Sequence, residues 1–450
     1  MSRVVTNLGR LKPRLPLGTP NSISDMQLQH PSSKSGQALD VARYQLVRQQ
    51  TEDLCKTLST EDYVVQSMPE VSPTKWHLAH TSWFFETFLL KTYKKFYRDF
   101  DPHFSYLFNS YYNAIGDRHC RQNRGLLSRP TVREIYNYRA HVDEHIVGLA
   151  LDGDRADAGQ LASLLELGLH HEQQHQELLL TDIKHVFWVN PLRPAYVERA
   201  IAEPSVARAS NWIAVVGGLR EIGHDGPGFA FDNEGPRHQE YIAPFEIASR
   251  LVTNGEFKQF ILEGGYRKPE YWLSLGWATV QSEQWQAPLY WLESRDEWQS
   301  HTLSGLRPIV DHEPVCHVSY FEADAFARWA GVRLPTESEW EIASGAVDPT
   351  QGSFVESCVF HPGVAEAGAG LQQMFGEAWQ WTSSSYSPYP RYSPGRGALG
   401  EYNGKFMCNQ YVLRGGSVAT PRTHIRRTYR NFFPPATRWQ FSGIRLARNL

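Results

Sequence analysis

Apolar residues recur at helical spacing through the first half of the chain and lose that spacing in the second half. In residues 41–58 they fall three and four positions apart, which predicts an amphipathic helix. Three further helices are expected at 70–90, 132–151 and 160–188, separated by proline, glycine and aspartate. Because four such helices pack economically as a four-helix bundle, the first half is predicted to be an all-α domain.

The helical pattern ends after Asn190, where two prolines interrupt the segment NPLRPAYVE. Beyond it, short strand-like runs at 212–216 and 411–414 and short helices at 254–263 and 321–329 predict an α+β domain dominated by loops. The predicted parts are a flexible tail over residues 1–35, the bundle over 36–190, a linker over 191–205 and the α+β domain over 206–450.

The amino-acid composition favours small molecules over nucleic acids or membranes as the binding partners of this protein. The 450 residues carry 45 basic and 48 acidic side chains, which gives a net charge of −3. A general nucleic-acid binder would carry an excess of positive charge, which this chain does not have. No apolar run is long enough for a membrane helix, and the N-terminus lacks the core of a signal peptide. The five cysteines are scattered and odd in number, which argues against a disulfide framework. We therefore expect a soluble cytoplasmic protein, acting on small molecules, with no nucleic-acid or membrane partner.

The sharpest chemical signal is the run HHEQQHQE, which begins at His170 on the last predicted helix. His171 and His175 stand one helical turn apart and can share a metal ion. The second predicted helix offers His77 and His80 in the segment WHLAH. Three imidazoles from two facing helices leave coordination positions open, as in a catalytic metal site.

The same run also matches the HExxH pattern of hydrolytic zinc helices. In that interpretation Glu172 would be the general base beside His171 and His175. Such matches also arise by chance, and the chain has no other protease feature, so the pattern alone does not decide.

Longer segments carry a family resemblance. The first half contains, in order, WHLAHTSWFFE, NSYYNAIGDRHCRQNRGLLSRPTVREIYNYRAHVDEH and HHEQQHQE. The second half contains GGLREIGHD, FAFDNEGPRH, LVTNGEF, CHVSYFEADAFARWAGVRLPTESEWE, EAWQWTSS, VLRGGS and FSGIRLAR. Together they resemble the sulfoxide synthases of ergothioneine biosynthesis, the hercynine oxygenases. The resemblance implies a DinB-like four-helix bundle joined to a C-type-lectin-like domain of the formylglycine-generating-enzyme (sulfatase-modifying factor) type, with the active site between them.

The resemblance also implies the cofactor and its ligands. An iron(II) ion would be held by His80, His171 and His175, whereas His77 and His170 match no ligand position and are expected to pack or to support the ligands. A three-histidine face leaves room on the iron for a thiolate and dioxygen.

The resemblance further implies residues that bind the trimethylated amino acid hercynine. Gln174 matches the glutamine that contacts the imidazole, and Asn431 matches an asparagine that helps hold the amino acid part. A quaternary ammonium cannot donate a hydrogen bond and is best held by aromatic faces, for which Phe432, Phe433 and Trp439 are candidates.

Two departures from the family pattern bear on the thiol donor. Members that use γ-glutamylcysteine carry Asn-Trp-Asp where this chain has Asn431-Phe432-Phe433, so the acidic residue is missing. The adjacent Tyr111 and Tyr112 match the branch that takes free cysteine, and we expect one of them, preferably Tyr111, to be the catalytic acid. In an extended segment the two side chains would point in opposite directions.

Three arginines are candidates for the donor's carboxylate. Arg121 and Arg124 match arginines that the family uses for it, and Arg129 is an equally plausible alternative. Should neither Tyr111 nor Tyr112 be catalytic, the acid is expected among tyrosines of the loop after Trp381. Those tyrosines are Tyr386, Tyr389 and Tyr392.

The implied reaction joins the sulfur of cysteine to the imidazole C2 of hercynine and yields a sulfoxide. Alternatives within the family use γ-glutamylcysteine, a selenosugar (selenoneine synthesis) or histidine (ovothiol type) as substrates. Outside it, a DinB-type thiol transferase, a lectin-like binding module and a formylglycine-generating oxidase remain open. The last of these needs a cysteine pair near the C-terminus, where Cys408 stands alone.

Overall fold

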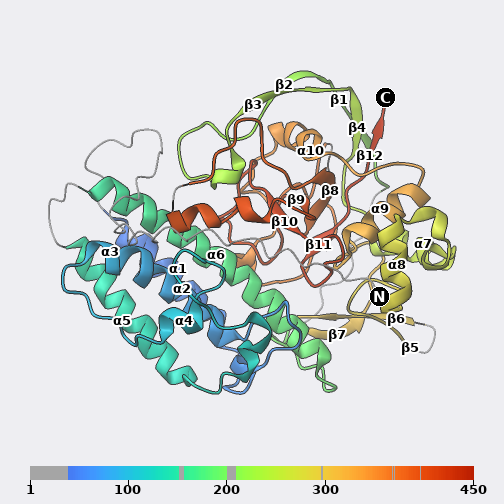
Figure 1. Ribbon diagram of the computed structural model, residues 1–450. Coiled ribbons are helices and arrows are strands. Elements are labelled where there is room, and N and C mark those ends of the chain that lie inside the picture. Colours follow the sequence, from blue (N-terminus) through green and yellow to red (C-terminus); the bar gives the residue numbers. More distant parts are fainter. Residues whose placement is uncertain are drawn as a thin grey trace, which may run out of the picture.

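Two domains share one long helix in the computed structural model, which describes residues 39–151, 157–199, 209–294, 297–366, 368, 370–395 and 397–450. The predicted tail over residues 1–35 and residues 200–205 of the predicted linker lie outside these ranges. The helices of the first domain gather on one side of the molecule, and α6 runs from them along the second domain (Figure 1).

The expected four-helix bundle is confirmed. Its long helices are α1 (Val41–Asp53), α2 (Thr74–Phe85), α5 (Val132–Ala150) and α6 (Ala158–Val189). The shorter pieces are a π-helical turn at Glu86–Leu90, α3 (Lys91–Tyr93), α4 (Phe104–Phe108) and 3-10 turns at Asp62–Val64 and Arg121–Leu126. The first helix ends five residues before the predicted 58, where i→i−3 turns replace the helical bonds.

The α+β character of the second domain is also confirmed, but the expected two helices are too few. The described helices are α7 (Asn254–Leu262), α8 (Ser274–Glu283), α9 (Tyr320–Trp329) and α10 (Glu337–Ala343). The strands are β1 (Trp212–Val215), β2 (Gly218–Ile222), β3 (His238–Ile242), β4 (Phe245–Ala248), β5 (Trp291–Ser294), β6 (Glu297–Thr302), β7 (Gly305–Pro308), β8 (Trp379–Ser385), β9 (Tyr411–Arg414), β10 (Asn431–Phe433), β11 (Ser442–Gly443) and β12 (Ala447–Asn449).

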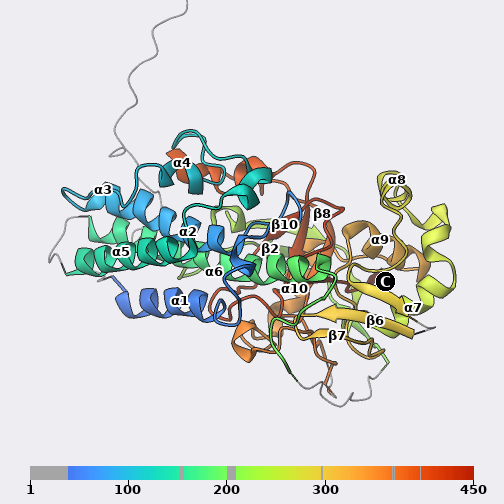
Figure 2. The same ribbon diagram turned by 90° about the horizontal axis from the view of Figure 1, so that it is seen from below.

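The strands form small sheets rather than one large one. The sheet that lies near α6 has the order β10-β9-β8-β11, in which only the β8–β11 pair is parallel. Two three-stranded sheets, β1-β4-β12 and β5-β6-β7, and the β2–β3 hairpin complete the described strands. Turned by 90°, the molecule shows α6 lying between the first helices of the chain and the second domain (Figure 2).

A buried charge network ties the bundle together. The Glu172 carboxylate on α6 accepts hydrogen bonds from Arg48 of α1 (2.9 Å) and Arg139 of α5 (3.0 Å). It also accepts from the Thr51 hydroxyl (2.7 Å), while Arg48 donates to Ser82 of α2 (2.9 Å). Burial acts to raise the pKa of Glu172, but the two arginines outweigh it and hold that pKa below its ordinary value. All four long helices therefore meet at one ionised carboxylate.

On the opposite side, α6 is bonded to the second domain. Glu177 is buried and accepts hydrogen bonds from Trp379 Nε1 (2.6 Å), Ser417 Oγ (2.6 Å) and Thr420 Oγ1 (2.8 Å). Gln173 Nε2 adds a bond to Thr423 Oγ1 (2.6 Å). The second domain thus docks on the helix that carries two of the predicted metal ligands. Within the described residues, no helix has the length and apolarity needed to cross a bilayer.

Replacing Glu172 by glutamine tests the network. The change removes the counter-ion that Arg48 and Arg139 share. Because Arg48 still pairs with Asp143 and Arg139 with Glu52, we expect the free energy of unfolding to fall by about 3 kcal/mol, at the lower end of the cost of breaking a buried pair. Urea denaturation measures it. The matched control is Glu166→Gln on the same helix, whose carboxylate is 40% exposed and pairs with Arg43, and which should cost under about 1 kcal/mol. Equal effects of the two changes would contradict the assignment.

Candidate metal centre and active site

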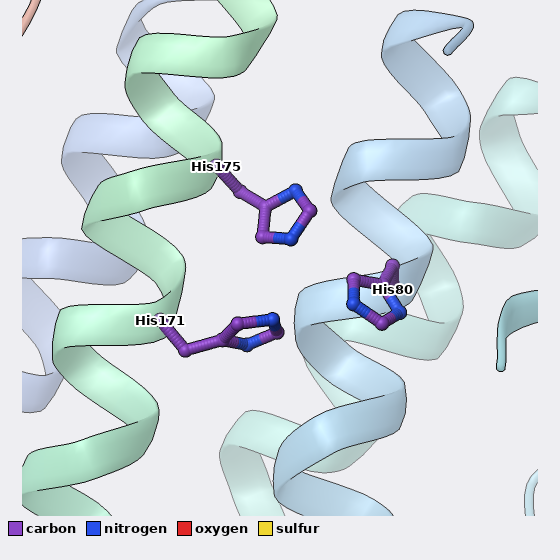
Figure 3. Close-up of side chains that lie close together, drawn as sticks. All are labelled: His80, His171 and His175. Carbon is purple, nitrogen blue, oxygen red and sulfur yellow. The ribbon is translucent and has the colours of Figure 1, made fainter. Parts of the chain in front are cut away.

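His80, His171 and His175 converge in the bundle. Helix α2 supplies His80, and α6 supplies the other two, one turn apart. One nitrogen from each ring lies within 4.8 Å of the others, and all three residues are buried. Figure 3 shows the rings turned toward a common point between the two helices. This cluster is the one group of possible metal ligands found among the described residues.

Hydrogen bonds leave particular ring nitrogens free. His80 Nδ1 lies 2.6 Å from the Phe108 carbonyl oxygen, to which it donates, so the buried Nε2 is left without a partner in the described protein. His175 Nδ1 lies 2.9 Å from His77 Nδ1, and His77 Nε2 lies 3.0 Å from the Asp182 carboxylate. If His77 Nε2 donates to Asp182 and His175 Nδ1 donates to His77 Nδ1, then His175 Nε2 carries no proton and is left free.

The electrostatics keep these rings neutral, as metal ligation requires. Burial lowers the pKa of His171 to about 3, even though the charge of Glu172 opposes the shift. Burial also lowers the pKa values of His80 and His175, and their imidazole neighbours add to the effect. A buried, unpaired Nε2 on His80 and two neutral imidazoles beside it fit a divalent metal with a preference for nitrogen ligands.

Glu172 does not face this cluster. Its two carboxylate oxygens are taken by Arg48, Arg139 and Thr51 in the bundle core. A general base must reach the water that it activates, and this carboxylate is fully buried among cations. The arrangement argues against the hydrolytic zinc interpretation of the HExxH match.

The second domain reaches the cluster through a tyrosine that the sequence analysis missed. The Tyr402 ring lies 5.8 Å from that of His171, and its hydroxyl donates to Gln174 Oε1. Tyr402 also stacks on Phe231 at 5.4 Å. It sits in the loop segment GEYNGKF, which has neither periodicity nor metal-ligand spacing, so no pattern pointed to it. Asp182 was missed as well, although it lies seven positions after His175 on the same face of α6.

Known proteins match the chain over both domains. Residues 43–179 match the DinB superfamily, and residues 198–357 and 351–450 match the sulfatase-modifying factor enzyme 1-like domain. A hercynine oxygenase of Mycolicibacterium smegmatis is 33% identical over 411 residues, which cover 85% of this chain and 92% of that protein. A hercynine oxygenase of Mycolicibacterium thermoresistibile is 31% identical over 437 residues, covering 90% and 95%. The chain belongs to the hercynine oxygenase family.

A more distant relative extends the same comparison. The ergothioneine biosynthesis protein 1 of Schizosaccharomyces pombe is 30% identical over 233 residues, which cover 49% of this chain and 28% of that protein. Membership of the family makes the chain an oxidoreductase with small-molecule substrates. It also argues against the lectin-like binding module, and the five cysteines are free, so no pair of the formylglycine-generating type is formed.

The tyrosine pair of this hercynine oxygenase adopts an arrangement other than the expected one. The rings of Tyr111 and Tyr112 stack 4.6 Å apart, so both side chains point the same way. The expectation of opposite directions is wrong because the backbone bends at Tyr111 instead of remaining extended. Tyr112 is fully buried 5.5 Å from the Trp83 ring, and its hydroxyl has no partner in the described protein. Trp83 in turn stacks on His80 at 5.4 Å.

Of the three candidate arginines, one lies near the histidine cluster. The Arg124 guanidinium lies 3.4 Å over the Trp76 ring, which stacks on His80 at 4.5 Å. Burial lowers the pKa of Arg124, and the charge of Arg121 adds to the shift. Arg121 and Arg129 are exposed and donate to backbone carbonyls of the first domain.

The remaining predicted substrate residues are divided between two sides of β10. Phe432 stacks on Tyr386 at 4.0 Å and lies 5.9 Å from Phe406, whose ring faces Tyr111 at 5.2 Å. Phe433 instead lies 6.4 Å from Trp439, because successive strand residues point to opposite faces. Asn431 shares the face of Phe433, and its Oδ1 accepts from the Phe432 backbone N–H (2.9 Å).

Gln174 and the three loop tyrosines have protein partners. Gln174 Nε2 donates to the Tyr429 hydroxyl (2.7 Å), which fixes the amide beside His171 and His175. The loop tyrosines bond to other residues of the second domain: Tyr386 to Asn233, Tyr389 to Glu337 and Tyr392 to Asp232.

Two substitutions test the metal site, one at a candidate ligand and one at Asp182, which orients His77 behind the ligands. His171→Ala removes one of the three candidate ligands and should abolish iron binding while the bundle remains folded. Asp182→Asn keeps all three ligands but weakens the acceptor that orients His77, so we expect iron affinity to fall by about 10- to 100-fold. Metal analysis after anaerobic loading and a chelator titration measure both. Normal iron content in His171→Ala would refute the ligand set.

Proposed function

We propose that this hercynine oxygenase uses iron(II) and dioxygen to join the sulfur of cysteine to the imidazole C2 of hercynine. The hydrogens of C2–H and S–H are lost, one oxygen atom enters the sulfoxide and the other leaves as water. This balance makes dioxygen the four-electron acceptor. The observation that carries the proposal is the buried cluster of His80, His171 and His175, with its unpaired nitrogen, in a chain that is 33% identical to a hercynine oxygenase.

The three histidines would hold the iron, which when bound supplies adjacent positions for a thiolate and dioxygen. The protein's own residues orient the substrates around it. Gln174 is fixed by Tyr402 and Tyr429 next to His171, which supports the proposal that its amide contacts the imidazole of hercynine. Phe432 stacks with Phe406, whose ring meets that of Tyr111 edge to face, and this group of rings would offer aromatic faces to the trimethylammonium group, as expected for Phe432.

Arg124 is the best-supported site for the carboxylate of the donor. It is buried and forms no ion pair in the described part of the chain, whereas Arg121 and Arg129 are exposed. A buried guanidinium without a carboxylate is stabilised when an anionic ligand arrives. Asn431 and Phe433 share the other face of β10, and their contacts with substrates stay predictions.

The tyrosine pair is proposed to supply the proton that accompanies carbon–sulfur bond formation. The sequence favoured Tyr111, but the buried hydroxyl without a partner is that of Tyr112, and this favours Tyr112 as the acid. Burial raises the pKa values of both phenols, so each retains its proton at neutral pH.

Product analysis tests the reaction as a whole. The iron-loaded enzyme is mixed anaerobically with hercynine and, in parallel, cysteine, γ-glutamylcysteine or a selenosugar, and is then exposed to air. Mass spectrometry should detect hercynylcysteine sulfoxide with one oxygen atom from labelled dioxygen. Histidine in place of hercynine tests the ovothiol type. Absence of any hercynine–sulfur product would refute the proposed function.

The donor preference rests on position 433, where the chain has phenylalanine instead of an acid. We expect kcat/KM for cysteine to exceed that for γ-glutamylcysteine by at least about tenfold, because the larger thiol would bury charged groups without partners. Competition between the two thiols in one reaction measures the ratio. A ratio of one or less would contradict the proposed donor.

Phenylalanine substitutions test the proposed acid. Tyr112→Phe should leave iron content and the binding of both substrates unchanged, yet divert oxygen to the thiol and yield cysteine sulfinic acid. Tyr111→Phe should be milder, since its ring mainly stacks on Tyr112. The ratio of sulfoxide to sulfinic acid measures the effect. If both single variants and the double variant keep the wild-type ratio, the pair is not catalytic.

A further inference from the structure

A half-buried carboxylate in the second domain has no counter-ion among the described residues. Asp232 opens the 3-10 turn Asp232–Glu234, and its oxygens accept hydrogen bonds from the Tyr392 hydroxyl (2.9 Å) and Asn403 Nδ2 (2.6 Å). In the described ranges it forms no ion pair with a basic side chain. Glu234, two residues on, is by contrast paired with Arg426. Asp232 is therefore the acid of this turn whose charge the protein leaves uncompensated.

Asp232 lies next to residues that reach the histidine cluster. It directly follows Phe231, whose ring stacks on Tyr402, and Asn403, which donates to it, directly follows Tyr402. Tyr402 in turn lies 5.8 Å from His171. Burial raises the pKa of Tyr402, and the negative charge of Asp232 contributes to the same shift. The carboxylate is thus close enough to act electrostatically on the tyrosine that contacts the metal ligands.

This setting suits a particular kind of cation. Burial raises the pKa of Asp232, because the hydrogen bonds from Asn403 and Tyr392 offset the loss of solvation only in part and no basic side chain of the described residues pairs with it. Tyr392 turns its hydroxyl toward Asp232, whereas the Phe231 ring, which stacks on Tyr402, has the Arg426 guanidinium 5.3 Å from its centroid, so an aromatic ring beside this carboxylate already faces a cation within the protein. A primary ammonium would need three acceptors, whereas a quaternary ammonium has no N–H and is bound by aromatic faces and a nearby negative charge.

We propose that Asp232 is the counter-ion of the trimethylammonium group of the substrate and selects for that charged group. The inference rests on the proposed function, because it takes hercynine as the imidazole substrate. It adds a specificity-determining charge from the FAFDNEGPRH segment to the predicted aromatic contacts. The expected consequence is that binding of the cation, and not of the imidazole ring, depends on this carboxylate.

Titration calorimetry on the iron-loaded enzyme without oxygen tests the proposal. The probes are hercynine and 3-(imidazol-4-yl)propanoate, which has the ring and the carboxylate but lacks the ammonium group. Asp232→Asn should weaken hercynine binding by about 10- to 100-fold and change the binding of the propanoate by less than about threefold. Asp232→Ser serves as a second variant with the same expectation if the first does not fold.

The control is Asp225→Asn, which removes an exposed carboxylate that pairs with Arg237 (2.7 Å) and should leave both affinities unchanged. Wild-type enzyme that does not bind hercynine at all would refute the proposed function itself. Wild-type binding that persists undiminished in Asp232→Asn, or an equal loss for both probes, would overturn this inference alone. So would a loss confined to the KM for cysteine, since the carboxylate would then serve the donor's primary ammonium.

Discussion

The ion pair between Glu172 and the two buried arginines sets the rotation of α6, and the active site depends on that rotation. Successive residues of an α-helix are turned by about 100° around its axis. With Glu172 held against Arg48 and Arg139 in the bundle core, His171 and His175 fall on one flank and face His80 of α2. A different rotation would carry these imidazoles into the bundle core or toward the second domain. The network is costly to desolvate, but it specifies one orientation.

The same rotation turns three further polar residues of the HHEQQHQE run toward the second domain, while Gln176 bonds to α1. Gln173, Gln174 and Glu177 bond to Thr423, Tyr429 and the Trp379–Ser417–Thr420 group, respectively. One eight-residue segment therefore orients the helix, supplies two of the candidate metal ligands and docks the second domain. Since Tyr402 approaches His171 only because the domains are docked, displacement at Glu177 would also disturb the site.

The features that could be predicted from the sequence are those that depend on a repeat of apolar residues or on the spacing of residues close together in the chain. The four long helices follow from a repeat of three and four apolar positions, and the His171–His175 pair follows from its spacing. Helix α10 was missed although Thr336 and Glu339 form a capping box, because seven residues are too few for a visible repeat. Tyr402 could not be found, since a loop residue reaches the histidines through tertiary packing alone. The stacked Tyr111 and Tyr112 were misjudged because a local bend overrides strand alternation.

The two domains contribute different groups to the site because their backbones place side chains in different ways. A helical bundle holds imidazoles rigidly at fixed rotations, which suits a metal, but the charged groups in its core are largely paired with one another, as Glu172 is with Arg48 and Arg139. The irregular second domain places rings and a carboxylate on loops and strand ends, where spacing is not restricted to a helical period. Tyr402, Phe406 and Asp232 come from such segments. The proposed reaction between a thiol and a charged amino acid would therefore draw on both surfaces, which gives the fused second domain a chemical role beside the candidate metal site.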